Sequence, residues 1–96
     1  MGRRHKLDVI FEILSLAQVG VNRTRLVYLT NINFSMLKRY LNVLYRMELI
    51  EDQGKMLMTT PKGARFVEEY DDFTSRWNFY EEFENSKEKL EKDITV

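Results

Sequence analysis

The stretch that follows Thr60-Pro61 contains no helix breaker after Gly63. Thr60 is a favourable residue for capping a helix, and Pro61 suits the first helical position because its missing N–H would have no partner there. We therefore expect one helix that begins near residue 60 and runs to about Lys92, about 32 residues and about 48 Å long. The preceding part of the chain is too short to cover a helix of that length.

A stripe of aromatic residues runs along this predicted helix and continues past the part of the helix that the rest of the chain can cover. Aromatic residues recur from Phe66 to Tyr80 at spacings of 4, 3, 4 and 3, as core positions of a coiled coil do, and a later shift in register resembles a stutter. Exposed aromatic rings favour association, so a second copy of the chain is the expected partner. The predicted dimerisation residues are Tyr70, Phe73, Trp77, Tyr80, Phe83 and Leu90. Alternatively, Phe66 and Tyr70 fold back onto their own chain, which leaves Trp77 and Tyr80 without cover.

The residues before Thr60 have the pattern of three helices and a hairpin. Apolar spacing predicts helices over 6–18, 23–30 and 34–47, and strands over 49–52 and 55–59 with Gln53-Gly54 at the tip. This order of elements is that of a winged helix-turn-helix. The sequence thus predicts a mainly α fold with a small β-hairpin: a head over 1–65 and a dimerisation helix over 66–96, continuous with the last helix of the head.

The third predicted helix has two chemically different faces. Its apolar residues fall within an arc of about 140°, and its polar residues fall within about 100° on the opposite side. The polar residues are Ser35, Lys38, Arg39, Asn42 and Arg46, and none is acidic. Such a face suits the major groove of DNA, where Arg and Lys bind guanine edges and phosphates and Asn binds adenine. A solvated basic face is the alternative reading.

The charges of the chain are segregated, although its formal net charge is zero. Residues 1–50 carry eight Arg or Lys against three Asp or Glu, a net charge of +5, and residues 51–96 carry −5. Such asymmetry points to an anion-binding head with a separate acidic part.

The residue inventory argues against catalysis and metal binding. The chain has no cysteine, and its one histidine, His5, has no evident nucleophile or acid as a partner. Asp71-Asp72 and Glu81-Glu82 are adjacent on a predicted helix, where neighbours point about 100° apart. We expect no enzyme activity, no metal, no cofactor and no evident small-molecule ligand. The sequence also shows no membrane span and no secretory signal, so we expect a cytoplasmic, nucleoid-associated protein.

Several local motifs resemble those of archaeal winged-helix regulators. These are Leu37-Lys38-Arg39-Tyr40-Leu41, Glu48-Leu49-Ile50 and Thr60-Pro61-Lys62-Gly63. With its long C-terminal helix, the chain is similar over residues 7–92 to the Sulfolobus ten-kilodalton DNA-binding protein family. That resemblance implies a winged-helix homodimer joined by an antiparallel coiled coil, acting as a chromatin protein or a regulator. Glu48 stands where the family often has glycine.

The resemblance also implies roles for particular residues. The helix over 34–47 would enter the major groove, and Arg23 and Arg25 would hold phosphate at the start of the second helix. Lys55 is the cation of the wing, and Arg3, Arg4 and Lys6 would form a basic arm. The implied partner is double-stranded DNA. The alternative function is a winged helix that binds another protein within a transcription or repair assembly.

Overall fold

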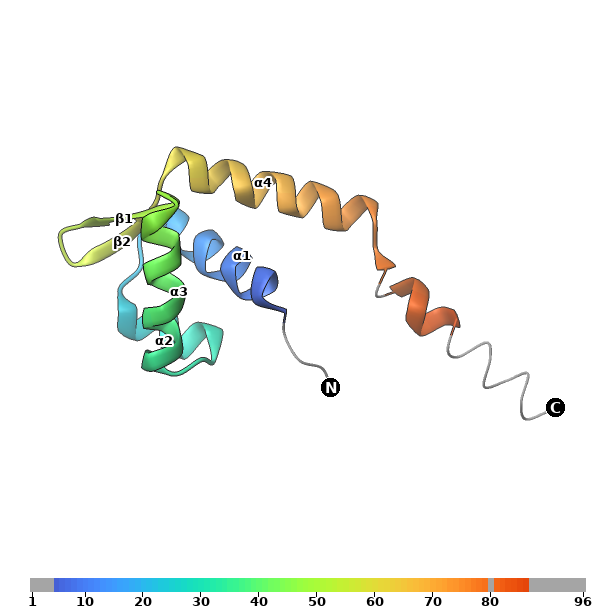
Figure 1. Ribbon diagram of the computed structural model, residues 1–96, viewed down its shortest axis with the longest axis horizontal. Helices are drawn as coiled ribbons and strands as arrows, with labels where there is room; N and C mark the ends of the chain where they lie inside the picture. Colours follow the sequence, from blue (N-terminus) through green and yellow to red (C-terminus); the bar gives the residue numbers. More distant parts are fainter. Residues whose placement is uncertain (1–4, 80, 87–96) are drawn as a thin grey trace.

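The computed structural model describes residues 5–79 and 81–86 as a head of three helices and a hairpin, from which one further helix projects (Figure 1). The elements are α1 (Lys6–Leu16), η1 (Ala17–Val19), α2 (Arg23–Thr30), α3 (Phe34–Arg46), β1 (Ile50–Gln53), β2 (Met56–Thr59) and α4 (Pro61–Arg76). The mainly helical fold with one antiparallel hairpin is therefore confirmed. The molecule is elongated, with extents of 62 × 26 × 20 Å. The helix α4 crosses the predicted boundary between residues 65 and 66.

Short polar side chains begin the helices where the sequence predicts them. The Asn22 side chain accepts a hydrogen bond of 2.8 Å from the Arg25 N–H at the start of α2. The Asn33 side chain does the same for Met36 at the start of α3, at 2.7 Å. Each cap satisfies one of the N–H groups that lack a partner in the first turn of a helix. The two helices of the helix-turn-helix are thus set by local signals.

The hydrophobic core lies where α1, α2, α3 and the hairpin meet. Its fully buried large side chains include Ile13, Leu14, Leu26, Leu37, Leu44 and Leu57. The apolar pattern that predicts the first helix begins at Leu7, but Leu7 is exposed, whereas Val9 and Ile13 are buried. Helix α1 packs on α4 as well as on the head, so its contact surface is wider than one narrow stripe.

The hairpin forms the wing, with Ile50 opposite Thr59 and Gln53 opposite Met56. The backbone of Val21 adds a bridge on the other side of β2 through two hydrogen bonds to Leu57, of 2.7 and 3.1 Å. The turn at the tip includes Gly54 at φ +66, a conformation that suits glycine. The sequence predicted this hairpin but not the Val21 bridge.

Thr60-Pro61-Lys62-Gly63 joins the wing to α4 and also ties α4 to the end of α3. The Thr60 hydroxyl accepts a hydrogen bond from the Gly63 N–H at 3.0 Å and donates one to the Glu48 carbonyl at 2.7 Å. The Lys62 ammonium donates to the Met47 carbonyl at 3.0 Å. Gly63 is buried, and a Cβ atom there would lie 2.2 Å from the Leu49 carbonyl oxygen. This motif therefore fixes where α4 leaves the head.

The predicted continuous helix from residue 60 to Lys92 is wrong, because α4 ends at Arg76. Trp77 leaves the helical conformation at φ −120 and ψ 74. The Asn78 side chain then accepts a hydrogen bond of 3.2 Å from the Glu81 N–H, next to a second helical segment that includes Phe79 and residues 81–86. Asn78 with Glu81 three residues later is a local signal for the start of a helix, and it interrupts the long helix although the stretch lacks glycine and proline. No long coiled-coil helix is present in the described residues.

The first part of the aromatic stripe packs against the head. The Tyr70 ring stacks on Phe11 of α1 at a centroid distance of 4.9 Å and lies 5.6 Å from the Phe66 ring. The Tyr70 hydroxyl donates a hydrogen bond to Asp8. Tyr70, predicted as a dimerisation residue, therefore has partners within its own chain. The fold-back alternative is the correct one for Phe66 and Tyr70, because α4 runs alongside α1 before it projects beyond the head (Figure 1).

Candidate nucleic-acid interface

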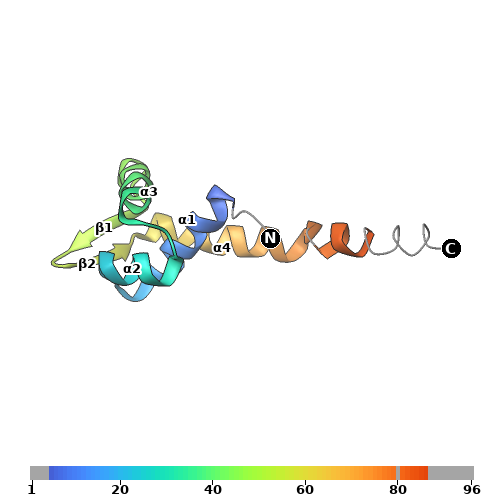
Figure 2. The ribbon, with the colours of Figure 1, turned by 90° about the horizontal axis from the view of Figure 1, so that it is seen from below.

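Helix α3 is presented on the outside of the head. Figure 2 looks along its axis and shows it projecting from one side, away from α2. Its buried residues are Leu37, Leu41 and Leu44, so the opposite side of the helix faces solvent. A helix held in this way by one apolar face has its other face free for a ligand.

All five polar residues predicted on α3 are exposed: Ser35, Lys38, Arg39, Asn42 and Arg46. The structure thus places them together on one surface with three cations and no carboxylate. Met36 and Val43, at 40% and 41% exposure, lie beside Arg39. Phe34 and Met47 belong to the apolar arc predicted for the helix over 34–47, but both are exposed because they lie at its two ends, where the core no longer covers them.

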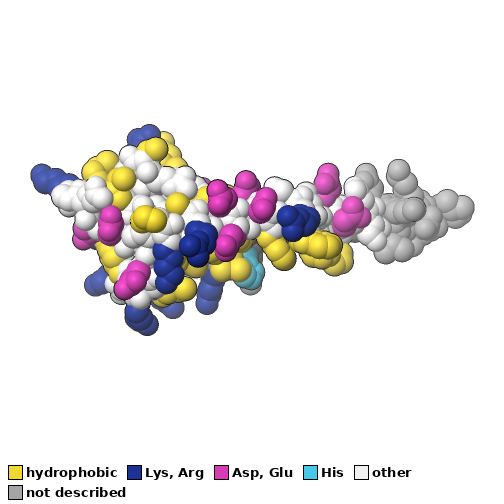
Figure 3. Space-filling model, turned by 90° about the horizontal axis from the view of Figure 1, so that it is seen from above, with side chains coloured by type: hydrophobic (Ala, Val, Ile, Leu, Met, Phe, Trp, Pro, Cys, Tyr) yellow, Lys and Arg dark blue, Asp and Glu magenta, His cyan; other side chains and the backbone are white. Residues whose placement is uncertain are grey.

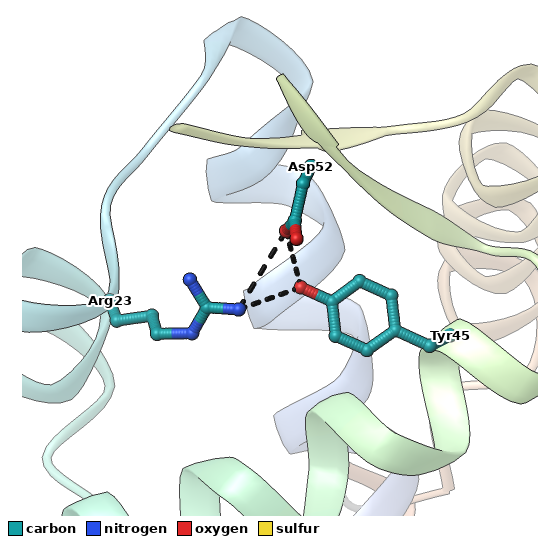
Figure 4. Close-up of polar contacts among 3 residues, drawn as sticks. All are labelled: Arg23, Tyr45 and Asp52. Carbon is teal, nitrogen blue, oxygen red and sulfur yellow. Dashed lines mark hydrogen bonds and ion pairs between the residues drawn. The ribbon is translucent and has the colours of Figure 1, made fainter. Parts of the chain in front are cut away.

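Arg23, predicted to hold phosphate, lies in a polar network that joins three elements (Figure 4). Its guanidinium donates a hydrogen bond of 2.8 Å to the Tyr45 hydroxyl and lies 3.7 Å from the Asp52 carboxylate. The Tyr45 hydroxyl in turn donates to Asp52 at 2.5 Å. Burial, and then the hydrogen bond to Asp52, raises the pKa of Tyr45 above its usual 10.0, and the Arg23 charge opposes this shift.

This network connects the start of α2, the end of α3 and strand β1 of the wing. It also means that the Arg23 charge is already partly balanced by Asp52. Reasoning from sequence missed the network because its members are 7 and 22 residues apart on different elements. Arg25 lies two residues further along α2 and is exposed.

The remaining predicted contact, Lys55, is exposed at the tip of the wing. The tip lies away from α4, and β1 next to it carries the carboxylates of Glu51 and Asp52. On the face shown in Figure 3, the Lys and Arg side chains gather over the head, whereas Asp and Glu predominate along the projecting part. The charge segregation expected from the sequence is thus also a separation in space.

The sequence matches the winged helix-turn-helix family over residues 3–77. The chain belongs to that family. The match covers the head and all of α4, and it stops one residue after this helix ends. No curated protein matches the sequence.

Beyond the head, this winged-helix protein exposes several large aromatic side chains. They are Phe73, Trp77, Phe79 and Phe83. Trp77 is 52% exposed and stacks on Phe79 at a centroid distance of 6.3 Å, and Phe83 is 71% exposed. Figure 3 shows hydrophobic side chains along one edge of the projecting part. Of the other predicted dimerisation residues, Tyr80 and Leu90 lie outside the described residues, as do Arg3 and Arg4 of the predicted basic arm.

The described part of the chain brings no three His, Cys, Asp or Glu side chains together in an arrangement that would hold a metal ion. None of its helices combines the length and the apolar character that crossing a bilayer requires.

Proposed function

We propose that this winged-helix protein binds double-stranded DNA, with α3 in the major groove. The observation that carries the proposal is the exposed face of α3, which presents Lys38, Arg39 and Arg46 with Ser35 and Asn42 and has no carboxylate among them. DNA binding requires cations for phosphates and planar hydrogen-bonding groups for base edges, and this face supplies both. The protein acts by binding and not by catalysis.

The second part of the proposal is a homodimer formed through the exposed aromatic residues. Phe73, Trp77 and Phe83 are each more than half exposed, and large aromatic side chains exposed close together often mark a protein–protein contact. Because Tyr70 packs on α1, the dimer contact begins after it, near Phe73. Two heads on one duplex would resemble the arrangement of the Sulfolobus ten-kilodalton family. The protein would then act as a chromatin protein or a regulator.

A salt titration of duplex binding tests the DNA proposal. With three to five phosphate contacts per head, two heads give a slope of log K against log salt of about −5 to −9. Arg39→Ala and Arg25→Ala should both weaken binding and flatten that slope. Loss of a residue that reads bases costs about 1–3 kcal/mol on the preferred site only, whereas loss of a phosphate contact weakens binding to all duplexes equally.

The matched control is Arg76→Ala, because Arg76 is an exposed cation at the end of α4, far from α3. It should leave the slope unchanged. Equal losses on every sequence for Arg39→Ala and Arg25→Ala would favour a chromatin protein over a regulator. A wild-type chain that binds no duplex at low salt would refute the proposal and favour the protein-binding alternative.

Sedimentation tests the dimer separately. The wild type should sediment at about twice its mass of 11.6 kDa. Changing both Phe73 and Trp77 to Asp should give monomers, whereas Glu69→Lys on the same helix should leave the dimer intact. A wild-type protein that sediments as a folded monomer at micromolar concentration would exclude dimerisation through these residues.

A further inference from the structure

A groove of about 330 Å³ lies between the start of α1 and one side of α3. Its lining consists of Lys6, Ile10, Met36, Arg39, Tyr40 and Val43. The apolar side chains form most of the surface, and none of these six side chains is acidic. Two of them, Lys6 from α1 and Arg39 from α3, carry positive charge. The groove thus combines an apolar lining with two cations.

This combination selects for one class of ligand. Small-molecule sites in proteins are mostly apolar, with a few polar groups that fix orientation, and have volumes of about 300 Å³ or more. A cavity of about 150 Å³ already holds benzene, so this groove has room for one or two rings and a polar substituent. Lys6 and Arg39 both line the groove and are exposed, so they would attract a carboxylate more strongly than an uncharged group.

We propose that this groove binds a small aromatic or aliphatic carboxylate. The apolar body lies against Ile10, Met36 and Val43, and the carboxylate binds Lys6 and Arg39. Arg39 also belongs to the exposed polar face of α3, so the ligand and DNA compete for the same guanidinium. The competition with DNA rests on the proposed function, whereas binding of the carboxylate to the groove does not.

The exposure of the lining residues supports access from solvent. Met36 and Val43 are apolar, yet each keeps about two-fifths of its surface exposed, at 40% and 41%. Both lie on the flank of α3 that faces the groove, beside Arg39. Apolar side chains on this flank add nothing to phosphate binding, but they suit a ligand with an apolar body.

The probe is 2-naphthoate, titrated into the full-length protein and followed by amide chemical shifts in NMR. Saturable shifts are expected at residues of α1 and α3 that line the groove, and the uncharged 2-naphthamide should bind about tenfold more weakly. Combining Lys6→Gln with Arg39→Gln should weaken 2-naphthoate binding by about tenfold or more. Lys38→Gln, on the other flank of α3, is the matched control and should leave binding of 2-naphthoate within about twofold.

A second variant separates ligand binding from folding. Val43→Glu places a carboxylate in the groove at an exposed position, so the chain should keep its helical circular dichroism and lose 2-naphthoate binding. Shifts that appear only around Phe73 and Trp77 would overturn the proposal, because they would show association with the exposed aromatic residues. Shifts of the groove residues that depend on protein concentration alone would show that a second copy fills the groove, and would also overturn it.

Duplex binding measured by fluorescence anisotropy tests the competition. Added 2-naphthoate should raise the apparent Kd of the wild type for DNA and should not change that of Val43→Glu. If the protein binds 2-naphthoate but no duplex, the carboxylate site stands and the proposed function fails. If it binds a duplex and shows no shifts with 2-naphthoate, the groove inference fails alone.

Discussion

Replacing Gly63 by Ala tests whether the close approach of α4 to the wing holds the head together. A Cβ atom at this position would lie 2.2 Å from the Leu49 carbonyl oxygen and 2.7 Å from the Thr59 methyl carbon. Carbon and oxygen atoms normally approach no closer than about 3.3 Å, so the backbone must move by about 1 Å. The same Leu49 carbonyl accepts a hydrogen bond of 3.0 Å from the Thr60 N–H, which the movement would strain.

Steric overlap at residue 63 and helix propensity predict opposite changes in stability for Gly63→Ala. In a helix with free space, Ala is more stable than Gly by up to about 1 kcal/mol. Overpacking in a filled site costs about 1–3 kcal/mol, and the upper end applies because the obstacle is backbone and not a flexible side chain. The net expectation is a loss of about 1–2 kcal/mol, which lowers the Tm by about 4–16 °C in a domain of this size.

Thermal unfolding followed by circular dichroism measures the change. The matched control is the pair Glu69→Gly and Glu69→Ala, at an exposed position of the same helix. There the alanine variant should be the more stable by up to about 1 kcal/mol. A Gly63→Ala protein that melts at or above the wild-type temperature would show that the contact with Leu49 is not tight.

Three further predictions concern the helix that faces solvent and the residues around it. Leu41→Ala should lower the free energy of unfolding by about 2–5 kcal/mol, whereas Asn42→Ala should change it little. Equal effects of the two substitutions in urea denaturation would show that α3 does not bury the face that carries Leu41. Glu48 has φ +61, a left-handed conformation that costs a residue with a Cβ about 1 kcal/mol. Glu48→Gly should therefore unfold at a higher urea concentration than the wild type. Unfolding at a lower urea concentration would count against strain at this position. The raised pKa of Tyr45 means that the folded state holds its proton more tightly than the unfolded state, so its contribution is complete below pH 10 and decreases as the pH rises through the folded pKa. The free energy of unfolding of the wild type should therefore fall more than that of Tyr45→Phe between about pH 8 and about pH 11, and parallel curves would contradict the assignment.

The sequence alone determined those features that depend on neighbouring residues. Asn22, Asn33 and Thr60 begin helices because each supplies a side-chain oxygen within three residues of the N–H that needs it. The polar face of α3 could be predicted for the same reason: the helical period places residues 3 and 4 apart on one side whatever the rest of the chain does. The wing follows from two short strands with a glycine between them.

Other features were decided only by the tertiary structure, because they depend on distance in space and not along the chain. Tyr70 belongs to the head and not to the open aromatic face because α1 lies beside α4. Arg23 is paired because the wing brings Asp52 to it, and the groove exists because Lys6 and Arg39 come from different helices. The end of α4 is an intermediate case: Asn78 and Glu81 carry a local signal for a new helix, but Trp77 can leave the helix there because the head no longer packs against it.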